Sequence, residues 1–144
     1  MREFLFRVWD SDTKIMSKPF SFKDLYGHSS GGSNMVGISD LASPEGIMFV
    51  RHSVLSIPDG VDPYLKIMQS TGLKDKNGKM IFEGDILQER NISYTFKYLV
   101  LFDRGAFILK SYALPEYPLL HCHGRCEIIG NQFENHELLE DVRR

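Results

Sequence analysis

Residues 67–87 read IMQSTGLKDKNGKMIFEGDIL, and this stretch decides the fold. An extended pattern from Leu65 to Leu73 predicts a strand, and Asn77-Gly78 is the residue pair best suited to the positive φ angles of a type I′ hairpin turn. Residues 80–82 predict a second strand that pairs with the first, and Gly84-Asp85 turns the chain into a third strand at 86–88. The stretch therefore predicts a hairpin followed by a corner.

Strand patterns also dominate the rest of the chain. Two β-rich runs, 96–102 and 106–112, flank Asp103-Arg104-Gly105, which predicts a three-residue hairpin loop with Gly at a positive φ angle. Apolar residues at 99–101 occupy both faces of the first run, so we place it centrally in its sheet. The ambiguous stretch is Phe20-Ser21-Phe22. Further strands are expected at 3–9, 14–16, 46–50, 52–57 and 127–130, and a short helix at 137–142 after the N-cap residue Asn135.

The spacing of these strands predicts a mainly β fold. Between about 66 and about 131 they are joined mostly by tight turns, which is typical of a small, strongly bent sheet or barrel of the SH3 or OB type. We expect one domain over 1–144, with N-terminal strands at about 1–62 packed on a barrel-like C-terminal region at about 63–144. The loops at 28–34 and 113–126 are expected to be available for recognition.

The composition is that of an ordinary globular chain. It has 144 residues, 42% of them hydrophobic and 25% charged, so its core needs no disulfide or metal for stability. A formal net charge of −2 excludes a global basic field that holds nucleic acid by phosphate contacts alone. No apolar run approaches the ~20 residues that span a bilayer, and the alternating start Phe4-Leu5-Phe6-Arg7 lacks the apolar core of a secretion signal. We therefore expect no membrane contact, a cytoplasmic location and reduced cysteines.

The segment 121–126, HCHGRC, places four potential metal ligands within six residues. Zinc favours histidine and thiolate ligands, so His121, Cys122, His123 and Cys126 are candidate ligands. Two or three of them would act with a histidine from elsewhere in the chain: His28, His52 or His136. The competing and favoured interpretation is a polar loop with half-buried thiols, because neighbouring side chains of an extended backbone do not easily converge on one ion. No cofactor is therefore expected.

Lys74, Lys76 and Lys79 cluster on the main hairpin and are candidate nucleic-acid-binding residues. Small barrels bind single strands by combining basic grooves with aromatic stacking, and aromatic residues are interleaved with basic ones from 82 to 110. The competing interpretation is that the aromatic side chains form the core while the lysines solubilise a hairpin tip. Single-strand binding is therefore the alternative function, not the preferred one.

Three other patterns are compatible with chemistry but fit ordinary turns better. Residues 27–31, GHSSG, match the nucleophile elbow around Ser29, yet the Gly-Ser-Asn continuation is poor helix material. Residues 75–78 resemble part of a calcium loop, but essential oxygen ligands are missing at 73 and 84. For Glu83 and Asp85 we favour a backbone corner at Gly84 over acid–base catalysis. We therefore expect no catalytic residues and no enzyme activity, a hydrolase or metal-dependent reaction being the weakest alternative.

Three segments of the chain are informative together: FLFRVWD at 4–10, MQSTGLKDKNGK at 68–79 with IFEGDI at 81–86, and IIGN at 128–131 with ENHELL at 134–139. In these segments the chain resembles the YopX-like proteins of phages and prophages. The central segment is the most specific, and the three come in the expected order across nearly the full length. The resemblance implies a phage or prophage protein that acts in a bacterial cytoplasm, and it implies no catalytic residues.

These observations favour a non-enzymatic module that binds a host or phage protein. A rigid β scaffold with loops for recognition and no credible catalytic set is typical of such modules. Single-stranded nucleic acid is the alternative partner. Residues 112–120 are rich in Leu, Tyr and Pro for a loop, so an apolar surface there would serve a protein partner or a second copy of the chain equally well.

Overall fold

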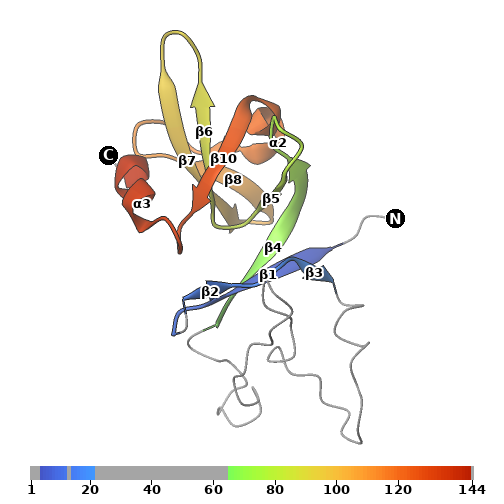
Figure 1. Cartoon of the computed structure of the whole chain (residues 1–144). Coiled ribbons are helices and arrows are strands. Elements are labelled where there is room, and N and C mark those ends of the chain that lie inside the picture. Colours follow the sequence, from blue (N-terminus) through green and yellow to red (C-terminus); the bar gives the residue numbers. More distant parts are fainter. Residues whose placement is uncertain (1–3, 13, 22–64, 144) are drawn as a thin grey trace, which may run out of the picture. The chain divides into compact units, whose positions relative to one another are not determined.

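The computed structural model describes residues 4–12, 14–21 and 65–143 (Figure 1). The chain divides into two compact units, Met1–Gln69 and Ser70–Arg144. The predicted loop at 28–34 and the predicted strands at 46–50 and 52–57 lie outside the described residues.

The first unit contains a small antiparallel sheet built around β1 (Leu5–Asp10). β1 pairs with β2 (Ile15–Met16), with β3 (Phe20–Ser21) and with the first half of β4 (Leu65–Lys74). The strands predicted at 3–9 and 14–16 are confirmed, and the ambiguous residues 20 and 21 form a short paired strand.

The second unit is a five-stranded antiparallel sheet with short helices against it. The strand order is β10-β6-β7-β8-β9, which confirms the central position predicted for the run at 96–102. The strands of this sheet are β6 (Asp85–Arg90), β7 (Thr95–Asp103), β8 (Ala106–Lys110), β9 (Tyr117–Pro118) and β10 (Cys126–Asn131). The second half of β4 forms a hairpin with β5 (Met80–Phe82) beside it.

Two hydrophobic clusters lie on opposite faces of this sheet because β7 is apolar on both sides. Tyr98 and Val100 belong to the larger cluster, whereas the alternate residue Leu99 packs with the smaller one. The smaller cluster consists of Ile86 with Leu139 and Val142 from α3 (His136–Arg143). The helix α3 therefore covers one face of the sheet, and β5 packs against the other.

Hydrogen bonds from the β4–β5 turn join that hairpin to β10 and turn the second unit into a half-barrel. The backbone N–H of Lys76 donates to the Cys126 carbonyl oxygen (2.9 Å), and the backbone N–H of Ile128 donates to the Asp75 carboxylate (3.0 Å). These bonds satisfy the outer edge of β10, which an open sheet leaves exposed. The prediction of a mainly β fold with a small bent sheet and a short C-terminal helix is confirmed.

Each of the two hairpin turns has the geometry that the sequence predicts for the other. At the β4–β5 turn only Gly78 has a positive φ angle (80°), so Asn77-Gly78 is not a type I′ pair. The Asp75 carboxylate accepts the N–H groups of Asn77 and Lys79 there, and this favours the right-handed conformation before the glycine. The type I′ pair is Arg104-Gly105, with φ angles of 47° and 81°, so the predicted three-residue loop is a two-residue loop.

The segment 113–126, predicted as a loop, is partly regular. It contains β9, the single helical turn α2 (Leu119–Cys122) and the 3-10 turn η4 (His123–Arg125). Leu119 and Cys122 are drawn into the larger cluster, and their burial supports helical turns that propensity alone does not predict. No helix in residues 4–12, 14–21 and 65–143 is long and apolar enough to cross a membrane.

Candidate functional site

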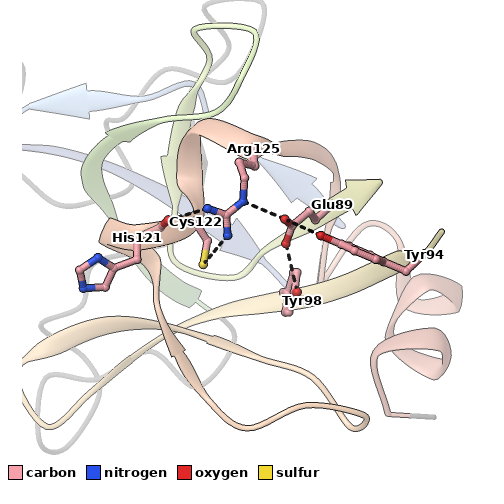
Figure 2. A network of polar contacts seen from close by, with 6 residues as sticks. All are labelled: Glu89, Tyr94, Tyr98, His121, Cys122 and Arg125. Atoms are coloured by element: carbon pink, nitrogen blue, oxygen red, sulfur yellow. Dashed lines mark hydrogen bonds and ion pairs between the residues drawn. The ribbon is translucent and has the colours of Figure 1, made fainter. Parts of the chain in front are cut away.

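A buried carboxylate on β6 organises the polar contacts near the turn end of the β6–β7 hairpin (Figure 2). Glu89 is 7% exposed, and its two oxygens accept three side-chain donors. The Nε of Arg125 donates to Oε1 at 2.8 Å, and the hydroxyls of Tyr94 and Tyr98 donate at 3.4 and 3.3 Å. A buried charge with this many donors is stable where it lies, because its lost hydration is replaced.

Arg125 uses the rest of its guanidinium to hold α2 and η4 against this carboxylate. Its Nη1 donates to the His121 carbonyl oxygen at 3.2 Å, and its Nη2 lies 3.7 Å from the Cys122 Sγ (Figure 2). The hydrogen bond to Glu89 raises the pKa of Arg125, while burial and then Glu89 raise the pKa of Tyr98. The network therefore fixes the turn end of the hairpin to the segment 119–125.

The β6–β7 hairpin extends past the rest of the second unit (Figure 1) and ends in a turn fixed by Asn91. The Oδ1 of Asn91 accepts the N–H groups of Ser93 (2.7 Å) and Tyr94 (3.0 Å), and its own N–H donates to the Tyr94 carbonyl oxygen (2.9 Å). Between these bonds lies Ile92, whose relative exposure of 106% is that of a free side chain. The turn thus presents an isoleucine to solvent on a locally rigid backbone.

An aromatic and a basic residue flank the turn that carries Ile92. Tyr94 is 38% exposed, and its ring lies 4.7 Å from the Phe96 ring, centroid to centroid. Its hydroxyl is held by Glu89, so the ring is fixed at both ends. Arg90 is exposed at the end of β6 and makes no ion pair with the described residues. We call Arg90, Ile92 and Tyr94 the hairpin tip.

Three other large apolar side chains of the second unit are exposed, one each on β7, β9 and α2. Phe102 is 52% exposed, Tyr117 47% and Leu120 65%. The Phe102 ring lies 5.1 Å from the Phe107 ring, which itself packs on the larger cluster. Arg104, in the β7–β8 turn, contacts Asp103 at 3.1 Å and Glu116 at 3.4 Å.

The candidate metal ligands at 121–126 point in different directions. Cys122 and Cys126 are buried free thiols, while His121 is exposed. The Nδ1–H of His123 donates to the Lys74 carbonyl oxygen at 2.6 Å. Within residues 4–12, 14–21 and 65–143, no three His, Cys, Asp or Glu side chains are grouped so that they could hold a metal ion. His28 and His52 lie outside these residues, so the metal site stays a prediction.

The three candidate lysines lie on the β4–β5 turn as predicted, and all are exposed. Lys76 forms an ion pair with Glu127 at 3.0 Å, and this contact lowers the pKa of Glu127. Glu127 thus neutralises the charge of Lys76, whereas Lys74 and Lys79 have no such ion pair with the described residues. The role of the turn in nucleic-acid binding stays a prediction.

The corner interpretation of Glu83 and Asp85 is confirmed. Asp85 is 2% exposed, and its Oδ2 accepts the backbone N–H of Phe82 at 2.8 Å, while Gly84 takes the positive φ angle of 85°. The turn interpretation of 75–78 is confirmed by the bonds that Asp75 accepts from Asn77 and Lys79. Ser29, the candidate nucleophile, lies outside the described residues.

Sequence reasoning missed the Glu89 network and the hairpin tip. No local pattern announces the network, because Glu89 and Arg125 are far apart in the sequence and meet only through the pairing of β6 with β10. The tip does carry a signal in Asn91-Ile92-Ser93, where an apolar residue stands between two turn-forming polar ones. An isoleucine in such a turn cannot reach a core, and that predicts its exposure.

A sequence profile identifies the family of this chain. The sequence profile described as YopX protein matches residues 5–140, so the chain belongs to the YopX family. A crystal structure of protein EF1440 from Enterococcus faecalis is 28% identical, covers 94% of this chain and 97% of its own, and has a TM-score of 0.57. The crystal structure of protein YopX from Bacillus subtilis is 16% identical over 93% of this chain and 96% of its own, with a TM-score of 0.49. No curated protein matches the chain.

Proposed function

We propose that this YopX-family chain is a phage or prophage protein that acts in the bacterial cytoplasm as a non-enzymatic protein-binding module, and that the hairpin tip enters a pocket of its partner. The observation that carries the proposal is the complete exposure of Ile92 on a turn fixed by three hydrogen bonds. Hiding an isoleucine from water is favourable, so a fold that holds one in solvent on a rigid support is suited to burying it in a partner.

The rigidity of the tip supports a role in binding. Ile is stiff at χ1, and the Asn91 turn fixes the backbone beneath it, so little conformational entropy is lost when Ile92 is immobilised. Tyr94 is fixed by Phe96 and Glu89 in the same way. Preorganised aromatic and basic side chains dominate the energetics of protein interfaces, and the tip combines Tyr94 and Arg90 with an aliphatic anchor.

Charge defines the kind of partner. Arg90 of the hairpin tip is exposed, and the Arg125 side chain, 61% exposed, shares its contact with Glu89 with Tyr94. The partner that fits is a protein with an apolar pocket for Ile92 and an acidic rim that faces Arg90. The polar network beneath supports scaffolding rather than chemistry, because Glu89 is fully occupied by donors from the protein itself.

Single-stranded nucleic acid has less support. Several cations that would line a binding groove are already paired with carboxylates: Lys76 with Glu127, Lys97 with Asp141 and Arg125 with Glu89. Each of these carboxylates would repel a phosphate that approached its partner. Lys74 and Lys79 remain as exposed cations, so they are the residues through which the alternative is tested.

Two labelled positions test the proposal by photo-crosslinking. A benzophenone amino acid is placed at position 92 and, as a matched control, at the exposed position Glu140 on α3, in chain expressed in a bacterial host. We expect a discrete light-dependent protein adduct from position 92 that survives nuclease treatment, and none from position 140. Equal adducts from both positions, or an adduct removed by nuclease, contradict the proposal.

Quantitative co-purification with the crosslinked protein then shows whether the partner binds the hairpin tip or the lysines of the β4–β5 turn. Ile92→Ser is expected to reduce recovery about tenfold or more, as is typical for a truncated anchor. It leaves the fold unchanged because the Ile92 side chain makes no contact in the core. The double variant Lys74→Ala/Lys79→Ala is expected to retain the partner. The reverse pattern, with loss in the lysine variant alone, favours nucleic acid.

A further inference from the structure

We propose that the β7 edge, by which we mean the outward N–H and C=O groups of Thr95 and Lys97, accepts an extended strand from the protein that the hairpin tip binds. The identity of this occupant rests on the proposed function, whereas the edge follows from the pairing of β7. On one side β7 pairs with β6 from Thr95 to Leu99, and on the other it pairs with β8 only from Leu99 to Asp103. In the described part of the chain, residues 95–98 therefore have a neighbouring strand on one side alone.

The hydrogen bonds of the β6–β7 ladder give the direction of the backbone groups along this edge. The N–H of Asn91 donates to the Tyr94 carbonyl oxygen, so these residues form a hydrogen-bonded pair. Such pairs alternate along an antiparallel ladder, so the backbone of Phe96 also faces β6. Thr95 and Lys97 therefore direct their N–H and C=O groups away from β6, and none of these groups is hydrogen-bonded to another of the described residues.

The neighbouring segments leave the β7 edge uncovered. After β8 ends, the N–H of Tyr112 donates to the Val142 carbonyl oxygen at the end of α3 and not to β7. Exposed lysines and prolines on edge strands discourage the addition of another strand. The ammonium group of Lys97 is held in an ion pair with Asp141 of α3, and this part of β7 contains no proline. The edge is therefore open to a partner strand.

The backbone and the side chains together define the occupant. A second β-strand matches the edge, because its N–H and C=O groups alternate with the same spacing. Arg90 lies opposite Thr95 in the hairpin, so both side chains are on one face, while the stacked rings of Tyr94 and Phe96 are on the other. The strand that fits has acidic residues on the Arg90 face and apolar residues on the ring face. Continued toward the turn, such a strand leads to Ile92, so one partner can bind both the edge and the tip.

NMR spectroscopy of the purified full chain with a synthetic peptide tests the edge. The probe is a capped peptide of about seven residues in which valine and glutamate alternate, and its like charges disfavour pairing with itself. We expect saturable shifts of the Thr95 and Lys97 amide signals at about 1 mM peptide, and slower hydrogen exchange of these two amides. The amide of Ile128 is the control and is expected not to change, because it already donates to Asp75.

N-methylated peptides separate strand pairing from other modes of binding. In an antiparallel pair, the residues that exchange hydrogen bonds with Thr95 and Lys97 have side chains on the Arg90 face, so they are the glutamates. Methylation of the glutamate nitrogens removes these donors and is expected to weaken binding about tenfold or more. Methylation of the valine nitrogens, which point away from β7, is the matched control and is expected to have little effect. Lysine in place of glutamate is expected to weaken binding about threefold or more, because of Arg90.

The protein crosslinked at position 92 shows whether the edge and the tip bind one partner. Thr95→Pro removes an N–H that bonds to no other described residue, so the hairpin is expected to stay folded, and Thr95→Val is the control that keeps this N–H. Recovery of the crosslinked protein is expected to fall about tenfold with proline and to stay unchanged with valine. Circular dichroism establishes that each variant is folded, and the peptide titration uses wild type and needs no substitution.

Three results overturn the inference. These are a valine–glutamate peptide that leaves the Thr95 and Lys97 signals unchanged, a glutamate-methylated peptide that binds as tightly as the unmodified one, and full recovery of the partner by folded Thr95→Pro. Each of them leaves the proposed function in place where position 92 gives its adduct. Absence of that adduct together with normal peptide binding refutes the proposed function and leaves the β7 edge as a site for strand addition.

Discussion

Asp75 joins the β4–β5 turn to β10, and its replacement by alanine is expected to destabilise the second unit strongly. The carboxylate is 6% exposed and accepts three backbone N–H groups, those of Asn77, Lys79 and Ile128, at 2.9, 2.9 and 3.0 Å. In the alanine variant water can reach the two turn N–H groups, but the N–H of Ile128 on β10 loses its partner. Charge-assisted bonds to a carboxylate contribute about 1.5–3 kcal/mol each, less where water substitutes, so we expect a loss of about 3 kcal/mol in unfolding free energy.

The loss is measured by urea denaturation at pH 7, with Lys76→Ala as the matched control. Lys76 is in the same turn, but its side chain makes only an exposed ion pair with Glu127, so its removal is expected to change stability little. A fall of about 3 kcal/mol corresponds to roughly 10 °C in melting temperature for a chain of this size. A loss below about 1 kcal/mol for Asp75→Ala refutes the view that this carboxylate closes the half-barrel.

The same carboxylate gives a pH dependence whose direction is fixed. Burial raises the pKa of Asp75, but the hydrogen bonds from Ile128, Lys79 and Asn77 outweigh it and hold the pKa below its usual value of 3.8. The stabilisation is therefore complete above the unfolded-state pKa and is lost as the pH falls through the lower folded-state value. The stability gap between wild type and Asp75→Asn is expected to narrow from about pH 4 downward. A difference in unfolding free energy between the two proteins that stays constant from pH 7 to the lowest pH measured contradicts the lowered pKa of Asp75.

Three further predictions follow from the second unit. Gly130→Ala places a Cβ 2.4 Å from the Asn135 Oδ1 and is expected to lower the free energy of unfolding by about 2 kcal/mol, measured by thermal melting. Gly124→Ala, where the new Cβ meets nothing within 4 Å, is the control and is expected to be neutral. Equal effects of the two substitutions contradict the clash. Arg125→Ala leaves Glu89 buried with only tyrosine donors and is expected to lower the free energy of unfolding by about 1–2 kcal/mol, measured by denaturant titration. The loss is expected to be smaller in a Glu89→Gln background, and additive effects of the two substitutions refute the contact. Burial, then Glu89, raises the pKa of Cys126 to about 12, so iodoacetamide at pH 8 is expected to leave this thiol unmodified until the chain unfolds, and rapid labelling of folded protein contradicts its burial.

The fold was predictable wherever a residue's role is decided by its near neighbours. The β-rich run at 96–102 and the turn residues around 77, 84 and 105 place the strands β4–β8, because strand composition and turn chemistry are local properties. The turn types were not predictable, because the Asp75 side chain accepts two N–H groups of the turn and leaves only Gly78 with a positive φ angle. Asn-Gly composition alone contains no information about that carboxylate.

The site was harder to predict because its members meet only in the folded chain. Glu89 and Arg125 come together when β6 pairs with β10, and nothing in either local sequence marks them as partners. The short helical turn at 119–122 likewise depends on the burial of Leu119, a tertiary effect that overrides a segment containing Pro115 and Pro118. The exposure of Ile92 was not predicted either, although its position between the turn-forming residues Asn91 and Ser93 is a local signal for it.

The HCHGRC segment shows why residue spacing is a weak guide to ligand geometry. In this segment the backbone passes from α2 through η4 into β10, so successive side chains leave it in different directions. Cys122 and Cys126 turn inward and join the larger cluster, His123 turns toward the Lys74 carbonyl, and His121 stays in solvent. Arg125, which the metal hypothesis treats as a spacer, makes the contacts that fix the segment. Side-chain direction, rather than ligand chemistry, thus decides what a cluster of histidines and cysteines can do, and direction is settled only when the strands pair.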